Sequence, residues 1–194
     1  MAAYQGGSQA AFEELFDRYA GSVYGFLVRR LGDVALTEDL HQEAFLRLHR
    51  ARKSYDPSRP FRAWLFSIVH NLLNDALRMR KRSPFAERRS ERSNPSSDEK
   101  LEQPCGGPPE AADDKASPER ILAARESGRA LSRALSALPA DEATVLILAR
   151  FEGLSYDDIG SVVGRSPTAT RQLAYRALKR VRAELVAAGH GEVE

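Results

Sequence analysis

The sequence FRAWLFSIVHNLLNDALRMRKR, residues 61–82, decides how the rest of the chain is interpreted. Its apolar residues recur every three or four positions, which is the spacing of a helix with a broad buried face. Ser83 and Pro84 follow this stretch and would stop the helix. We therefore predict one long helix over residues 61–82, whose buried face consists of Phe61, Trp64, Leu65, Ile68, Val69, Leu72, Leu73, Ala76 and Leu77.

The end of this helix is basic, because four of its last five residues are cations: Arg78, Arg80, Lys81 and Arg82. Cations at a helix C-terminus are favoured by the helix dipole, so a charged cap is one interpretation. The other interpretation is a phosphate-binding surface. Asn71 and Asn74 precede the cations, so apolar, amide and cationic groups follow one another along one helix. This order suits a nucleic acid whose bases are partly exposed.

Composition restricts the class of protein. The 194 residues, 42% of them hydrophobic, can build one large or two small domains. No apolar run is long enough to span a membrane, and residues 1–10 do not resemble a signal peptide, so we expect a cytoplasmic protein without membrane insertion. Cys105 is the only cysteine and the four histidines are scattered, so we expect no disulfide, metal or cofactor. The net charge of +2 means that any nucleic-acid surface must arise from charge distribution.

Two further helices are predicted before this stretch. Ser8 can cap the first, which closes near residues 31–33, and the second runs over residues 36–53. In the second helix the apolar residues form one face, and the polar residues Asp39, Gln42, Glu43 and Arg47 lie mostly off it. The loop SYDPSRP, residues 54–60, then separates the second helix from the third. Residues 1–82 therefore read as a three-helix bundle.

Composition changes abruptly after residue 82. Residues 83–118 contain six of the ten prolines and more acidic than basic residues, which is typical of a flexible linker. Cys105 lies in this segment and is interpreted as an exposed thiol without a resolving partner. We predict an all-α chain of two small helical domains, residues 1–82 and 119–194, tethered by the linker.

The second domain ends in a candidate helix-turn-helix. Helices are predicted over residues 119–138 and 141–151, and Ser155 with Asp158 forms a capping box before a short third helix. A Gly164-Arg165-Ser166 turn leads into a longer basic helix, residues 167–187. A short helix, a tight turn and a basic helix suit binding in a DNA major groove. A plain helical hairpin with a solvated basic face is the alternative. For Tyr175 there is a separate alternative, in which its ring packs on the domain.

Three segments together resemble a known family: EDLHQEAFLRLHR at 38–50, FRAWLFSIVHNLLNDALR at 61–78 and LSYDDIGSVVGRSP at 154–167. They are similar to the extracytoplasmic-function group of bacterial sigma-70 factors, and the likeness covers nearly the whole chain except the linker. The resemblance implies sigma domain 2 in residues 1–82 and sigma domain 4 in residues 119–194. It also implies a non-enzymatic subunit that binds core RNA polymerase, through the β′ clamp and the β flap, and promoter DNA.

The resemblance further implies particular contacts in the first domain. The β′ clamp would bind Asp39, Gln42 and Glu43. The loop over residues 55–60 would capture a base flipped out of the minus-10 element, and the helix after it would help to melt and read that element. His70 stands where the family often has arginine, so any contact there would be weak or pH-dependent. The implied minus-10 contacts are Ser58, Arg59, Asn71, Asn74, Arg78, Arg80 and Lys81.

The minus-35 reader of the family corresponds to residues 166–182 here. The chain has Thr168-Ala169-Thr170 where many members read Gly-Thr-Val, and Leu173 occupies a position that is frequently basic. The implied contacts are nevertheless residue types that reach bases or phosphates: Thr168, Arg171, Gln172, Tyr175, Arg176, Lys179 and Arg180. Membership would also imply an inhibitory anti-sigma factor.

The sequence gives less support to two other classes of function. A repressor or activator that uses only the helix-turn-helix would require a dimer on a symmetric operator, and the sequence has no obvious dimerisation heptad. An enzyme has little support, because the sequence contains no phosphate-binding glycine loop, nucleophile motif or paired metal ligands.

Overall fold

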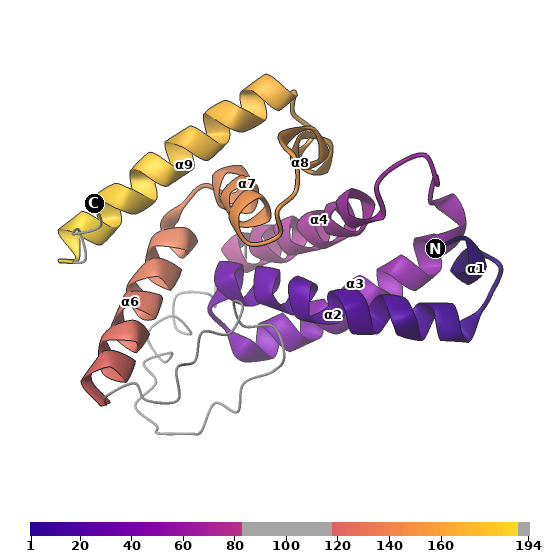
Figure 1. Cartoon of the computed structure of the whole chain (residues 1–194), viewed down its shortest axis with the longest axis horizontal. Coiled ribbons are helices and arrows are strands. Elements are labelled where there is room, and N and C mark those ends of the chain that lie inside the picture. The colour runs from indigo at the N-terminus through magenta and orange to yellow at the C-terminus, as the bar shows by residue number, and fades with distance from the viewer. Residues whose placement is uncertain (83–117, 190–194) are drawn as a thin grey trace.

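The computed structural model describes residues 1–82 and 118–189, and within these ranges the side chains of all residues except Lys81 and residues 118–125. Residues 83–117 of the linker, with Cys105, therefore lie outside the described residues, as do residues 190–194. All regular elements of the described residues are helical (Figure 1). In chain order they are α1 (Ala2–Gln5), α2 (Gln9–Leu31), α3 (Val34–Ala51), the 3-10 turn η1 (Arg52–Ser54), α4 (Phe61–Arg82), α6 (Pro118–Ala137), α7 (Ala140–Arg150), α8 (Tyr156–Val163) and α9 (Pro167–Ala187).

Local sequence signals explain the ends of these helices. The Ser8 hydroxyl accepts a hydrogen bond from the Ala11 amide at the start of α2, and the Asp33 carboxylate accepts one from the Leu36 amide at the start of α3. Between them Gly32 ends α2 with a φ of 62°, a left-handed conformation that favours glycine. The predicted helix over residues 61–82 is confirmed to the residue as α4.

The N-terminal half buries one face of each of its three long helices. Its core packs α2 against α3 and α4, which confirms the predicted bundle. The structure adds helix α1, whose Tyr4 is 3% exposed and forms a hydrogen bond of 2.8 Å with Nδ1 of His49 near the end of α3. The fully buried large side chains of this half are Val23, Phe26, Leu27, Leu48, Leu65, Phe66, Val69 and Leu73.

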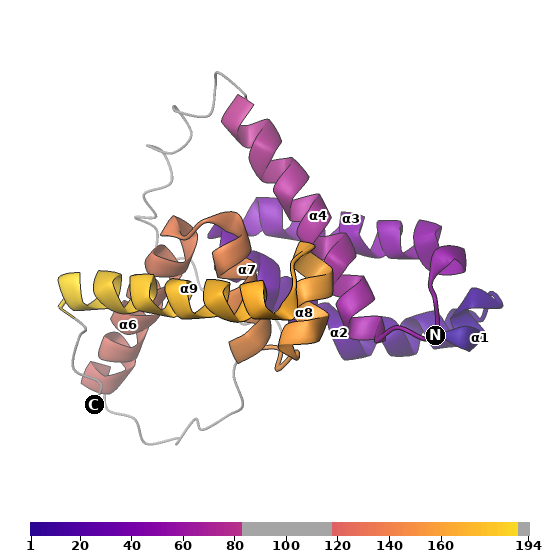
Figure 2. The same cartoon turned by 90° about the horizontal axis from the view of Figure 1, so that it is seen from above.

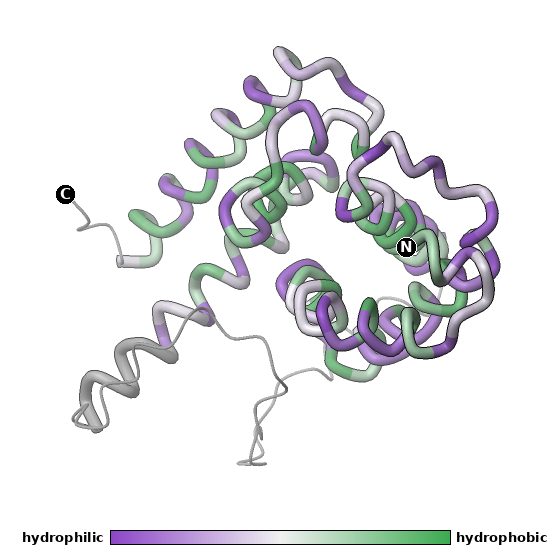
Figure 3. The backbone as a smooth tube through the Cα atoms, turned by 45° about the vertical axis from the view of Figure 1, so that its right-hand side comes forward, coloured by the Kyte–Doolittle hydropathy of each residue, from purple (hydrophilic) through white to green (hydrophobic). Residues whose placement is uncertain are grey.

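The C-terminal half contains the predicted helix-turn-helix, formed by α8 and α9. The Ser155 hydroxyl accepts a hydrogen bond from the Asp158 amide and donates one to the Asp158 carboxylate, a variant of the predicted capping box. Gly164 ends α8 with a φ of 66°. Helix α9, which runs toward the C label in Figure 3, alternates between hydrophobic and hydrophilic residues, so one side packs on α7 and the other faces solvent.

The two halves pack against each other, an association that the sequence did not predict. Residues 142–148 of α7 are all buried, seven in succession, which requires neighbours on every side of the helix. Helices α8 and α9 cover part of α7, and α2 and α4 of the N-terminal half cover the rest (Figure 1). The halves therefore share one continuous hydrophobic core. Asp39 and Arg176 nevertheless both remain exposed, so the surfaces that the sequence singled out are not sealed by this contact.

Candidate functional site

The polar face of α3 is open to solvent. Asp39 and Gln42 are exposed and Glu43 is half-buried, as their position off the apolar face predicts. On the opposite side His41 ties α3 to α2, because its Nε2 donates to the Ala20 carbonyl at 3.1 Å. Burial lowers the pKa of His41 below its usual value, so this ring stays neutral at physiological pH. The half-buried His41 therefore fixes the helix, while Asp39 and Gln42 face solvent.

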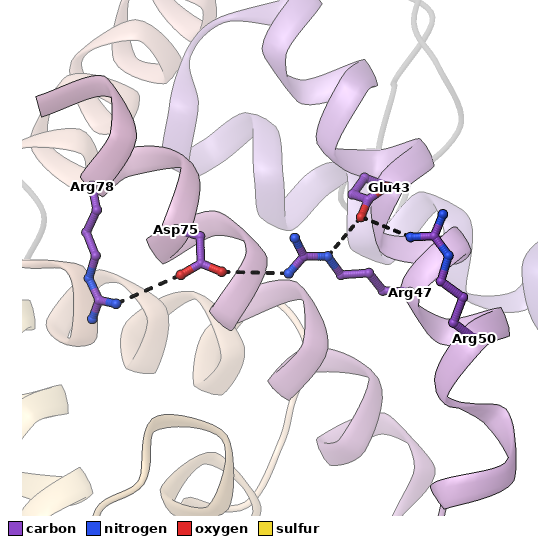
Figure 4. Close-up of polar contacts among 5 residues, drawn as sticks. All are labelled: Glu43, Arg47, Arg50, Asp75 and Arg78. Atoms are coloured by element: carbon purple, nitrogen blue, oxygen red, sulfur yellow. Dashed lines mark hydrogen bonds and ion pairs between the residues drawn. The ribbon is translucent and has the colours of Figure 1, made fainter. Parts of the chain in front are cut away.

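An ion-pair chain connects this face to α4 (Figure 4). The Glu43 carboxylate pairs with Arg47 at 2.9 Å and lies 3.7 Å from Arg50, and Arg47 in turn lies 3.7 Å from Asp75 on α4. Asp75 also lies 3.9 Å from Arg78, one of the sequence-predicted DNA contacts. Each pair is partly exposed, so each contributes at most about 1 kcal/mol to folding. These ion pairs place cations of α3 and α4 on one shared surface.

The loop before α4 is a compact turn. The Asp56 carboxylate accepts a hydrogen bond from the Ser58 amide at 2.9 Å, and the Arg59 amide donates to the Asp56 carbonyl at 3.1 Å. The first of these bonds holds the pKa of Asp56 below its usual value. Tyr55 is 8% exposed, and its ring packs against that of Trp64 with a centroid separation of 4.9 Å. Ser58 and Arg59 are exposed at the tip of this turn.

Helix α4 divides into a covered and a free part. Its last turns, with the exposed Arg78 and Arg80, project beyond the other helices (Figure 2). Asn71 is exposed as predicted, whereas Asn74 is half-buried and donates its amide to Nε2 of His70 at 2.9 Å. Of Lys81, only the place on the helix is described.

His70 is buried between the halves rather than exposed toward a ligand. It is 4% exposed, and since Asn74 donates to Nε2, the proton on Nδ1 donates to the Thr144 hydroxyl of α7 at 3.2 Å. Burial lowers the pKa of His70, and the neighbouring Arg30 adds to this effect while Asp141 opposes it. The family resemblance implies a weak or pH-dependent DNA contact at position 70, whereas in the structure the His70 ring forms a contact between the two halves.

The predicted recognition residues of α9 share one open face. Thr168, Arg171, Gln172, Arg176 and Lys179 are exposed. Tyr175 is 71% exposed, so the alternative in which its ring packs on the domain is wrong. Arg180 is also exposed, but its Nε lies 3.3 Å from the buried carboxylate of Glu142, which gives it a structural role as well.

A cavity of about 360 Å³ lies between the two halves, beside the loop that precedes α4. The loop and the start of α4 supply both apolar and polar side chains to its walls, and α8 supplies polar ones. Nearby, Arg62 of α4 pairs at 3.0 Å with Glu152, which is 8% exposed. The cavity is lined by Arg59, Pro60, Ala63, Trp64, Ser67, Asp158 and Ser161.

Several contacts at these surfaces could not be found from sequence. Gln5 reaches the loop from α1, and Glu152 reaches α4 from a turn 90 residues further along the chain. Only the helix caps and the apolar periodicity carried a local signal. Among residues 1–82 and 126–189, no group of three or more histidine, cysteine, aspartate or glutamate side chains could hold a metal ion. No helix within the described ranges is both long and apolar enough to cross a membrane.

Comparison with known proteins assigns this chain to a family. The family model for sigma-70 region 2 matches residues 15–83, and the model for sigma-70 region 4 matches residues 128–181. The RNA polymerase sigma factor CarQ of Myxococcus xanthus is 35% identical over 94% of this chain and 93% of its own length. The chain is a sigma factor of the extracytoplasmic-function group. It therefore acts in the initiation of transcription.

Other relatives agree with this assignment. The RNA polymerase sigma-H factor of Pseudomonas aeruginosa is 31% identical over 91% of this sigma factor and 87% of its own length. The extracytoplasmic-function sigma-E factor of Escherichia coli K12 is 29% identical, with the same coverage of both chains. The solved structure of CnrH in complex with the cytosolic domain of CnrY covers 96% of this chain and 94% of its own, with a TM-score of 0.66 and 24% identity. It shows that the fold is shared.

Proposed function

We propose that this sigma factor binds core RNA polymerase through α3, reads and opens the minus-10 element with the loop over residues 55–60 and α4, and reads the minus-35 element with α9. The observation that carries the proposal is that all three surfaces are exposed on one chain, within or beside the ranges that match regions 2 and 4. The chain supplies binding and strand separation, and the polymerase supplies the chemistry. No catalytic role is assigned to any of its residues.

The polymerase contact is placed on Asp39, Gln42 and Glu43. The carboxylates of Asp39 and Glu43 offer an acidic edge that complements a basic partner surface, here the β′ clamp. Glu43 is already paired with Arg47, so polymerase binding would exchange one cation for another rather than strip a free carboxylate of water. Exposed charges of this kind contribute chiefly to the rate and specificity of association. The C-terminal half would contact the β flap.

The minus-10 contact is placed on the turn and on the free end of α4. Flipping a base out of the duplex costs a few kcal/mol, which a pocket for the base and cationic contacts to the opened strand can offset. Ser58 and Arg59 at the tip of the turn are suited to the base, and Arg78, Arg80 and Lys81 to the phosphates. Asn71 is free to reach the strand, whereas Asn74 would first have to leave His70.

The minus-35 contact is placed on the first turns of α9. Pro167 at the first helical position has no amide proton and the Ser166 hydroxyl accepts the Ala169 amide, so few backbone donors are free at this end of α9 and side chains would do the reading. Arg171 and Gln172 are suited to base edges, and Arg176, Lys179 and Arg180 to phosphates. Thr168 and Tyr175 complete the open face. Arg171 also lies 5.8 Å above the ring of Tyr156, which orients it.

An inhibitory partner is also proposed. Two solved structures of this fold are complexes, one of CnrH with the cytosolic domain of CnrY and one of the sigma factor RpoE of Bartonella quintana with the anti-sigma factor NepR. An anti-sigma factor that covers the α3 and α9 faces would prevent both polymerase binding and promoter recognition. Co-purification from the native cell, followed by release of activity when the partner is removed, would test this part.

The test of the main proposal is transcription in vitro. Purified chain is added to core polymerase on genomic templates, and the transcript ends are sequenced. We expect initiation downstream of a shared pair of minus-35 and minus-10 motifs. Asp39→Arg should slow and weaken polymerase binding, whereas Arg176→Ala should leave polymerase binding intact and weaken initiation only at promoters that depend on the minus-35 motif. Specific binding of a palindromic site without polymerase, and no initiation with it, would favour a repressor instead.

A further inference from the structure

Helix α1 holds the loop that the proposed function assigns to the minus-10 base. The side-chain amide of Gln5 donates two hydrogen bonds to backbone carbonyls at the entry to that loop, one to Arg52 at 3.0 Å and one to Tyr55 at 2.8 Å. Gln5 is half-buried, and α1 itself is seated on α3 by Tyr4. The first five residues of the chain therefore brace a segment that lies about 50 residues away in sequence.

Tyr55 closes the same loop from within. Its hydroxyl donates to the Arg59 carbonyl at 2.6 Å, so the loop is tied across its base as well as at its entry. Burial raises the pKa of Tyr55, which keeps the hydroxyl protonated and able to donate. The Tyr55 ring packs against the rings of Phe61 and Trp64 of α4, with centroid separations of 5.8 and 4.9 Å. Gln5 and Tyr55 thus bond backbone carbonyls of the loop and its entry, and neither bonds the exposed side chains of Ser58 and Arg59.

We propose that Gln5 and Tyr55 are positioning residues for minus-10 recognition: they hold the loop over residues 55–60 in the shape that receives the flipped base. The inference rests on the proposed function of that loop. A short loop with several rotatable bonds would otherwise lose conformational entropy when a base binds. Bonds already made in the free chain reduce that loss. Their removal would therefore weaken base recognition without touching a base-contacting atom.

The test uses holoenzyme assembled from full-length chain and core polymerase. Binding is measured by fluorescence anisotropy to single-stranded oligonucleotides that carry either the minus-10 motif or the same motif with the flipped base replaced. Gln5→Ala and Tyr55→Phe should each reduce the preference for the correct base about three- to tenfold, as expected for one or two hydrogen bonds. Gln9→Ala is the matched control, because Gln9 makes only a local bond of 2.9 Å to Glu13.

The outcomes separate positioning from general stability. If Gln5→Ala and Tyr55→Phe lowered binding of both oligonucleotides equally, or changed the preference no more than Gln9→Ala, the inference would be overturned. Polymerase affinity and the unfolding midpoint are measured in parallel, and we expect both to stay close to wild type for Tyr55→Phe. A wild-type holoenzyme with no preference between the oligonucleotides would instead refute the proposed role of the loop itself.

Discussion

Gly160 in the middle of α8 offers a sharp test of the helix-turn-helix geometry. A Cβ atom at this position would lie 2.6 Å from the Arg165 carbonyl oxygen and 3.2 Å from the Thr170 hydroxyl. The first contact is far shorter than van der Waals separation and involves backbone. The Arg165 carbonyl cannot retreat freely, because the Arg165 amide is bonded to the Gly160 carbonyl at 2.9 Å. We therefore expect Gly160→Ala to push α9 away from α8.

The cost follows from that clash. Overpacking of a well-packed site costs about 1–3 kcal/mol, and the backbone contact places Gly160→Ala at the upper end, about 2–3 kcal/mol. For a chain of this size that corresponds to a fall in Tm of roughly 4–12 °C. Gly128→Ala in α6 is the control, because its added Cβ would meet nothing within 4 Å. Alanine in an exposed helix interior should instead stabilise by about 0.5–1 kcal/mol.

Urea denaturation and thermal melting followed by circular dichroism measure both variants. The expected result is a change of opposite sign at the two glycines, accompanied by weaker minus-35 binding for Gly160→Ala alone. If Gly160→Ala remained within about 0.5 kcal/mol of wild type, the close packing of the turn on α8 would be refuted. Equal destabilisation by both variants would show that the approach of the Arg165 carbonyl does not control the result, because nothing lies within 4 Å of the added Cβ at residue 128.

Three further predictions concern stability. Arg180→Ala should cost about 1–3 kcal/mol in urea denaturation because it strands the buried Glu142 carboxylate, whereas Lys179→Ala should stay within about 0.5 kcal/mol, although both remove a candidate phosphate contact. Ser166→Ala should cost about 1 kcal/mol through the lost cap of α9, seen as a lower urea midpoint. Burial lowers the pKa of His70, so as pH falls through about 6.5 the unfolded chain binds a proton at this residue before the folded chain does. The contribution of His70 to stability is therefore full above that pH and declines below it. The urea midpoint of His70→Gln should accordingly fall less between pH 7.5 and 5.5 than that of wild type.

Helix positions could be predicted from sequence because their signals are local. Apolar residues at helical spacing identified α4, and Ser8 and Ser155 were recognisable as caps because the cap bond spans only three residues. The cap at Ser166, which the sequence placed in the turn, is an addition from the structure. The exposure of Asp39, which lies off the apolar face of its helix, followed from the same periodicity. Periodicity reports which face is buried, and this is sufficient for helices that are buried on one side.

The contact between the halves could not be predicted in this way. Residues 142–148 of α7 have the sequence of a moderately apolar helix, and no signal in the neighbouring residues indicates that the N-terminal half covers their remaining face. The partner of Glu152 is 90 residues distant, and that of Gln5 is about 50 residues distant. Family resemblance implied that Ser58 and Arg59 contact DNA from the loop over residues 55–60, but it did not indicate what holds that loop in place.

The burial of residues 142–148 of α7 has a thermodynamic consequence. Helices of both halves cover these residues, so separation of the halves would expose part of this apolar surface to water. Calorimetry of the free chain should accordingly record a single endotherm rather than two. Two lobes that evolution treats as separable regions would then melt as one cooperative unit, and their separation by a partner would carry a measurable increase in heat capacity.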